Sequence, residues 1–144
     1  MAVSAKLYGT VLAQLWAGGI NWGSDTIKVA LTTSAYTPDQ DAHDFFNDIT
    51  NEVTGTGYTA GGATLASKTS TYTSGTNTQA LDAADVTWSS STITARYGVI
   101  YKSTGTASTS PLIGYVDFGA DVISSGGPFT ITWDAAGAIS FTVS

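Results

Sequence analysis

The one histidine of the chain, His43, is the first candidate for catalytic chemistry. Nucleophilic catalysis by a Ser-His-Asp group needs a histidine base beside a serine held in a tight turn. His43 stands among aspartates, and the sequence has no Gly-x-Ser-x-Gly turn. A single histidine without any cysteine also makes a zinc site improbable and removes disulfides and thiolate chemistry. We therefore interpret His43 as an exposed or half-packed residue without a catalytic role.

Carboxylates are the second group that could do chemistry. Calcium needs six to eight oxygens that converge on one point, and a glycosidase needs two carboxylates that face each other across a cleft. The first acidic group would spread over one helix face instead, and the later aspartates mostly stand beside turn residues. The first group comprises Asp39, Asp41, Asp44, Asp48 and Glu52, and the later one Asp82, Asp85, Asp117, Asp121 and Asp134. We expect neither a metal site nor an enzyme, and no cofactor.

The stretch TGTGYTAGGATL, residues 54–65, resembles a phosphate-binding loop in its glycine content. Such a loop follows a strand and opens a helix, whose first amides face the anion. Here the order of predicted elements is reversed, and no Gly-Lys-Ser/Thr follows. We expect Gly55 to end a helix in the left-handed conformation. Gly61 and Gly62 would permit a bend or a close approach to a neighbouring chain.

Four tryptophans, Trp16, Trp22, Trp88 and Trp133, could stack on sugars. Trp88 and Trp133 lie in runs whose neighbours of the same parity are apolar. A place in the core or in a subunit contact is therefore the better interpretation, and a sugar-binding face stays the alternative.

Composition limits the partners. The chain has 144 residues, a net charge of −6 and a pI near 4.2, which disfavours nucleic acid. Serine and threonine exceed a quarter of the residues, a composition typical of strands and turns. The N-terminal apolar run is too short to span a membrane, and it matches the pattern of a signal peptide only weakly. We expect one domain, residues 1–144, made soluble in a cytoplasm, with no membrane partner.

Two helices are predicted in the first third of the chain. Leu7, Val11 and Leu15 recur at steps of four, and Gly18 and Gly19 follow them, which indicates an amphipathic helix in segment 1–22. A second helix is predicted at about 38–53, with Thr37 as its cap, Pro38 in its first turn and Gly55 after its end.

The rest of the chain is predicted to be β-structure. DTIKVALTT, residues 25–33, alternates as a half-buried strand does. From Tyr58 onward short apolar runs alternate with Ser, Gly, Asn and Asp clusters. TITARYGVIYK would place Ile93, Ala95, Tyr97, Val99 and Tyr101 on one face. The fold class is therefore mainly β: a jelly-roll-like antiparallel β-sandwich over residues 25–144, with two short helices in the N-terminal third.

Residues 25–65 and the segments DVTWSSSTITARYGVIYKS and PLIGYVDFG carry a resemblance. They are similar to a family of small virion structural proteins of tailed double-stranded DNA bacteriophages, over nearly the whole chain from about Lys6. The resemblance implies a non-enzymatic virion protein without transferable catalytic residues. It favours a capsid decoration (cement) or minor capsid protein, which binds the outside of the major capsid protein shell as an oligomer, with a trimer favoured. The alternative is a tail-associated protein, in the tube, tip or fibre, or a glycan-binding module.

In an assembly role, two surfaces are candidates for the contact with other subunits. Segment 1–22 would pack on its own domain or reach into a neighbouring protein, and the glycine-rich loop would permit close subunit approach. The candidate contact residues are Leu12, Leu15, Trp16, Ile20, Trp22, Gly57, Tyr58, Gly61 and Gly62.

Overall fold

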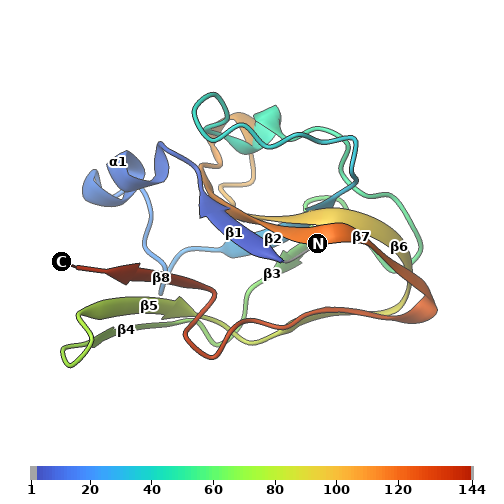
Figure 1. Ribbon diagram of the computed structural model, residues 1–144. Helices are drawn as coiled ribbons and strands as arrows, with labels where there is room; N and C mark the ends of the chain where they lie inside the picture. The colour runs from blue at the N-terminus through green and yellow to red at the C-terminus, as the bar shows by residue number, and fades with distance from the viewer. Residues whose placement is uncertain (1–2, 144) are drawn as a thin grey trace.

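The computed structural model describes residues 3–143, which fold mainly into antiparallel β-strands (Figure 1). The strands are β1 (Ser4–Leu7), β2 (Ile27–Thr32), β3 (Ala63–Thr64), β4 (Thr69–Thr73), β5 (Thr78–Asp82), β6 (Val86–Lys102), β7 (Leu112–Ile131) and β8 (Ile139–Thr142). The helical elements are α1 (Val11–Trp16) and two 3₁₀ turns, Phe46–Asp48 and Ala107–Thr109. The prediction of a mainly β chain is confirmed.

The strands form two sheets. The larger sheet has the order β1-β7-β6-β2-β3 and the smaller one the order β4-β5-β8, and all neighbours within them are antiparallel. The smaller sheet contributes Leu81, Ile139 and Phe141 to the hydrophobic cluster that β2, β6 and β7 line. Figure 1 shows β6 and β7 as the longest strands, curving from the larger sheet toward the level of the smaller one.

Strand β2 lies where its alternating pattern predicts it, but it is buried on both faces. Val29 and Leu31 face the main cluster, whereas Ala30 belongs to a second cluster on the other side. Partly buried Phe46 and Ile49, from the connection between β2 and β3, pack against that second cluster. The prediction of a half-buried strand is therefore wrong, because this connection covers the face that the small and polar residues present.

The prediction of one continuous face along β6 is also wrong. Ile93 and Ala95 pack in the main cluster, but Tyr97 and Val99 lie with the second cluster. The pairing with β7 is irregular between Ala95 and Tyr97, where the partner register jumps. Such a β-bulge moves the following side chains to the opposite face of the sheet.

The predicted helix at about 38–53 is absent, and only the 3₁₀ turn Phe46–Asp48 forms there. The Asp39 carboxylate accepts the N–H groups of Asp41 and Ala42, and the Asp48 carboxylate accepts those of Asp44 and Phe45. Aspartate side chains that bond nearby backbone in this way compete with a helix. The carboxylates expected to support the helix therefore stabilise turns in its place.

The N-terminal helix is shorter than predicted. Leu7 belongs to β1, which pairs with β7, and α1 begins only at Val11. The predicted glycine stop is confirmed: the N–H of Gly18 bonds the carbonyl of Leu15, and that of Gly19 bonds the carbonyl of Gln14. With Gly18 at a φ of +72°, this is a Schellman motif. Residues 1 and 2 of the predicted segment 1–22 lie outside the described residues.

Candidate assembly surface

Helix α1 presents an apolar ridge to solvent. Leu12 is 50% exposed and Trp16 is 89% exposed, and the two lie one helical turn apart. The opposite side of α1 is anchored, since Val11 is buried and Leu15 packs against the main cluster. The ridge, Leu12 and Trp16, is therefore an exposed apolar feature on an anchored element, and large apolar side chains exposed together are typical of interaction sites.

Two other candidates from the N-terminal segment are core residues. Ile20 and Trp22 are both buried in the main cluster, and the indole Nε1–H of Trp22 donates to the carbonyl oxygen of Asp82 at 3.1 Å. A partner contact through these two side chains is incompatible with that burial. The interpretation that the segment packs on its own domain holds for them.

The glycine-rich loop packs closely on its own chain. A Cβ at Gly62 would overlap the Val29 carbonyl oxygen of β2, and one at Gly57 would lie 3.0 Å from Cα of Ser91. The prediction that Gly55 ends a helix in the left-handed conformation is wrong, because no helix ends there and Gly55 has no positive φ. A Cβ at Gly55 would instead overlap the Thr92 carbonyl oxygen of β6. The close approach that glycine permits is thus made within the chain.

Tyr58 and Glu52 fix the same loop. The Tyr58 hydroxyl donates to Glu52 Oε1 at 2.6 Å and accepts from the N–H of Leu31 at 3.0 Å. Burial, and then the bond to Glu52, raise the pKa of Tyr58 well above its ordinary value. The Gly61 N–H donates to the same Glu52 oxygen at 2.5 Å. Because a carboxylate already occupies this amide, the loop offers no cradle to a phosphate.

His43 is half-buried and takes part in a hydrogen-bond chain that sequence reasoning missed. Its Nδ1 lies 2.9 Å from the hydroxyl of Tyr36, which lies 2.9 Å from the hydroxyl of Tyr8. No spacing pattern in the sequence predicts this contact. Tyr8 comes from the β1–α1 junction, and Tyr36 and His43 come from the long connection after β2. The polar partners of His43 are the Tyr36 hydroxyl and the backbone N–H of Asp39, so the geometry is not that of a catalytic triad.

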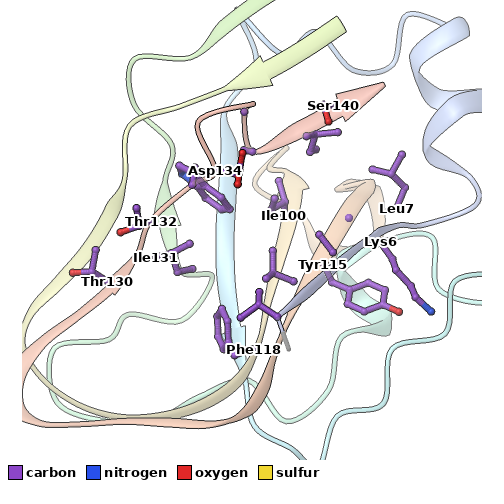
Figure 2. A pocket seen from close by; sticks show the side chains of 18 residues that line it. Lys6, Leu7, Ile100, Tyr115, Phe118, Thr130, Ile131, Thr132, Asp134 and Ser140 are labelled. Atoms are coloured by element: carbon purple, nitrogen blue, oxygen red, sulfur yellow. The ribbon is translucent and has the colours of Figure 1, made fainter. Parts of the chain in front are cut away.

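A groove of about 700 Å³ opens between β1 and β8, the edge strands of the two sheets (Figure 2). Ile100, Phe118 and Ile131 give it apolar side chains, and Lys6 and Asp134 add charge. Asp134 is the only carboxylate among the described residues that line this groove, and it accepts the N–H of Ala136. The groove therefore lacks the carboxylate pair that glycoside hydrolysis requires.

Two ion pairs stabilise the fold. Arg96 makes a two-pronged ion pair with Asp117, with Nε at 2.6 Å and Nη2 at 3.2 Å from the carboxylate oxygens. This guanidinium holds the pKa of Asp117 below its ordinary value. Lys102 pairs with Asp25 at 2.9 Å. Within residues 3–143, no three His, Asp or Glu side chains gather as they would around a metal ion.

The chain matches no protein-family model, no curated protein and no solved structure. Among the described residues, no helix has the length and apolar character needed to cross a membrane. The resemblance to phage virion proteins stays a prediction, and the ridge and the groove are the surface features on which a function can be proposed.

Proposed function

We propose that the protein is a non-enzymatic structural protein of a tailed bacteriophage virion. Within the virion we propose that it is a capsid decoration protein, which binds the major capsid protein shell from outside as an oligomer, with a trimer favoured. The observation that carries the proposal is the ridge of Leu12 and Trp16 on an anchored helix. An exposed tryptophan held on a rigid element is the kind of anchor that dominates protein interfaces.

Three further features support a structural protein over an enzyme. His43 is engaged with tyrosines, the Glu52 carboxylate holds the glycine-rich loop, and the groove contains one carboxylate. We also interpret the two sheets as the layers of an antiparallel sandwich, the architecture that small decoration proteins generally have. Their shared cluster, to which Leu81 and Ile139 contribute, supports this arrangement.

Binding to head shells tests the proposal. Purified protein is mixed with empty, mature shells that lack it, the shells are sedimented, and bound copies are counted as a function of concentration. We expect saturable binding in multiples of three per symmetry-related position, because weak contacts add when several subunits engage one shell. Absence of binding to heads would refute the decoration role.

The ridge is tested with a matched pair of variants. Trp16→Ala removes the anchor, and Ile123→Ala truncates another exposed apolar side chain, on β7. We expect Trp16→Ala to weaken shell binding by roughly tenfold or more, and Ile123→Ala to leave it within about twofold. Equal effects of the two variants would show that the ridge is not the contact.

The groove favours a second candidate, a tail-associated module that binds glycans. Trp133 lines the groove, which combines its aromatic ring with polar groups. The polar residues Thr132, Asp134 and Ser140 are labelled in Figure 2. The indole Nε1–H of Trp133 is used in a bond to Ala84, so a sugar would stack on the ring itself. A glycan array distinguishes the two functions: binding that Trp133→Ala abolishes would favour the tail.

A further inference from the structure

The connection between β2 and β3 holds the junction between β1 and α1. We call its residues 36–48 the clasp. The N–H of Gly9 donates to the carbonyl oxygen of Gln40 at 2.8 Å, and the Gln40 side-chain amide donates to the carbonyl oxygen of Leu7 at 2.6 Å. These bonds lie on either side of Tyr8, between the end of β1 and the start of α1 (Figure 1). The clasp therefore fixes the point from which the ridge projects.

The centre of this contact is the chain of bonds from Tyr8 through Tyr36 to His43. Tyr8 is 0% exposed and Tyr36 is 1% exposed. Burial raises the pKa of Tyr8 far above its ordinary value and that of Tyr36 to about 12, so both hydroxyls keep their protons. Each hydroxyl therefore has one proton to donate, and the direction of the chain depends on the imidazole.

The backbone of Asp39 settles that direction. Its N–H points at His43 Nδ1 at 3.3 Å, and a backbone N–H can only donate. We therefore assign Nδ1 as an acceptor that carries no proton. Tyr36 donates to Nδ1, and Tyr8 donates to Tyr36, which satisfies both hydroxyl protons.

A proton on Nδ1 would reverse the chain. The ring N–H would face the Asp39 N–H, donor against donor, and Tyr36 would have to accept from the ring and donate to Tyr8. Within residues 3–143 the Tyr8 hydroxyl has no hydrogen-bond partner besides Tyr36. Its O–H would be left unpaired in a fully buried site, which is unfavourable.

Other groups around His43 act on the same proton. Those that face the chain are Asp39 and Asp48 from the clasp, Tyr97 from β6 and Tyr115 from β7. The two carboxylates attract an imidazolium, but Asp39 is exposed, Asp48 is only half-buried, and each already accepts two backbone N–H groups. Solvent-screened attraction of this kind is weak, whereas the unpaired hydroxyl is buried. The cost of a proton on Nδ1 that the geometry shows is therefore the unpaired hydroxyl of Tyr8.

We propose that the clasp is proton-sensitive: when His43 takes up a proton, the clasp loosens its hold on Tyr8, and the β1–α1 junction gains freedom. The inference rests on the proposed function only in the role that it gives the ridge. If the ridge is the contact surface, acidification would leave Leu12 and Trp16 less firmly positioned for binding. Ordinary imidazoles take up a proton between about pH 8 and pH 5, so this is the interval to examine.

Hydrogen–deuterium exchange of the Gly9 amide, followed by NMR on the whole chain, measures the clasp directly. Protection is expressed relative to the unstructured rate at each pH, and the amide of Ala30 in β2 serves as an internal reference. We expect protection at Gly9 to fall about tenfold between pH 7.5 and pH 5, the effect of one unpaired buried hydroxyl, and that at Ala30 to stay constant. The imidazole ring protons report in the same samples whether His43 titrates.

Three variants isolate the cause. Tyr8→Phe removes the hydroxyl that protonation would leave unpaired, and His43→Asn keeps an acceptor near the position of Nδ1 but does not titrate. Both should make Gly9 protection independent of pH. Tyr115→Phe, a hydroxyl in the same cluster but outside the chain, should retain the tenfold fall.

The exchange measurements test the proposal on the free protein, without any head shell. Constant Gly9 protection in the wild type would overturn the proposal, as would a ring that does not titrate between pH 8 and pH 5. A fall that persists in Tyr8→Phe or His43→Asn would overturn it as well. Because exchange is measured on the free protein, failure of the decoration role would leave this result unaffected.

Discussion

Gly62 provides the sharpest test of how the glycine-rich loop is packed. Gly62 and Gly18 have the same φ of +72°, so alanine at either position meets the same backbone penalty. Their surroundings differ. Nothing lies within 4 Å of a Cβ at Gly18, whereas a Cβ at Gly62 would overlap the Val29 carbonyl oxygen and lie 2.6 Å from Cα of Ala30. Comparing alanine at the two positions therefore separates the backbone cost of a positive φ from the cost of the close approach to β2.

The two magnitudes follow from this difference. Left-handed backbone costs an alanine about 1 kcal/mol, so Gly18→Ala should lower the free energy of unfolding by about that amount. Gly62→Ala must in addition displace backbone, because Val29 and Ala30 are fully buried and β2 cannot retreat. The pairing of β2 with β3 at Val29 and Ala63 would be disturbed. With an overpacking cost of about 2 kcal/mol, the expected total is about 3 kcal/mol.

Urea denaturation followed by circular dichroism measures both variants under the same conditions, with linear extrapolation to water. The difference between the two losses, about 2 kcal/mol, is the quantity of interest. If the losses agree within about 0.5 kcal/mol, the close approach to β2 contributes nothing and glycine at position 62 is needed only for its φ. The packing argument for the whole loop would then fail.

Three further changes test the core, the loop and the ion pair. Trp22→Ala should lower the free energy of unfolding by about 4 kcal/mol in the same assay, since it empties a core site, and a loss below about 1 kcal/mol would contradict its burial. Tyr58→Phe leaves the buried N–H of Leu31 without a partner and the Glu52 carboxylate with only the Gly61 N–H, and should cost about 2 kcal/mol; an unchanged midpoint would refute the proposed anchor. The bond from Arg96 lowers the pKa of Asp117, so the folded state favours the charged carboxylate. That stabilisation is complete above about pH 4 and is lost as the pH falls through the lower folded-state pKa. The midpoint difference between the wild type and Asp117→Asn, measured by thermal melts, should therefore be present at pH 6 and vanish near pH 2; a constant difference would exclude the titration.

Local patterns predicted the positions of β2 and β6 but not which faces are buried, and they assigned Leu7 of β1 to a helix. β2 follows from the alternation of residues 25–33. The bulge between Ala95 and Tyr97 could not be predicted in this way. The bulge depends on how β6 pairs with β7, about twenty residues away. The alternating pattern of apolar residues in β6 is the same with or without the bulge.

The segment 38–53 shows that residues typical of helix ends do not by themselves predict a helix. Thr37, Pro38 and Gly55 all agree with a helix, yet each aspartate can bond either as a helix-end charge or as a turn former. The choice is made by distant partners. The N–H of Leu112 donates to the Asp44 carbonyl oxygen, and the N–H of Phe46 donates to the Ser110 carbonyl oxygen. These bonds to the β6–β7 connection replace those that a helix would make.

The candidate contact residues divide for a similar reason. Trp16 and Trp22 are the same residue type in the same segment, and no local pattern distinguishes an exposed tryptophan from a buried one. The distinction comes from the Schellman turn at Gly18, after which the chain turns inward and places Trp22 against β5 through its bond to Asp82. The glycine stop was visible in the sequence, but the direction of the chain after it was not.

Charge distribution gives a physical reason why assembly would use the ridge. The chain carries a net charge of −6, and like-charged proteins repel each other when acidic surfaces approach. Two of its few cations are paired internally, Arg96 with Asp117 and Lys102 with Asp25. Residues 7–24 contain no charged side chain at all, and the most exposed apolar residue of the described chain, Trp16, lies within them. Contact through this stretch would bury apolar surface without desolvating a charge on this chain, so an acidic protein could use it at low electrostatic cost.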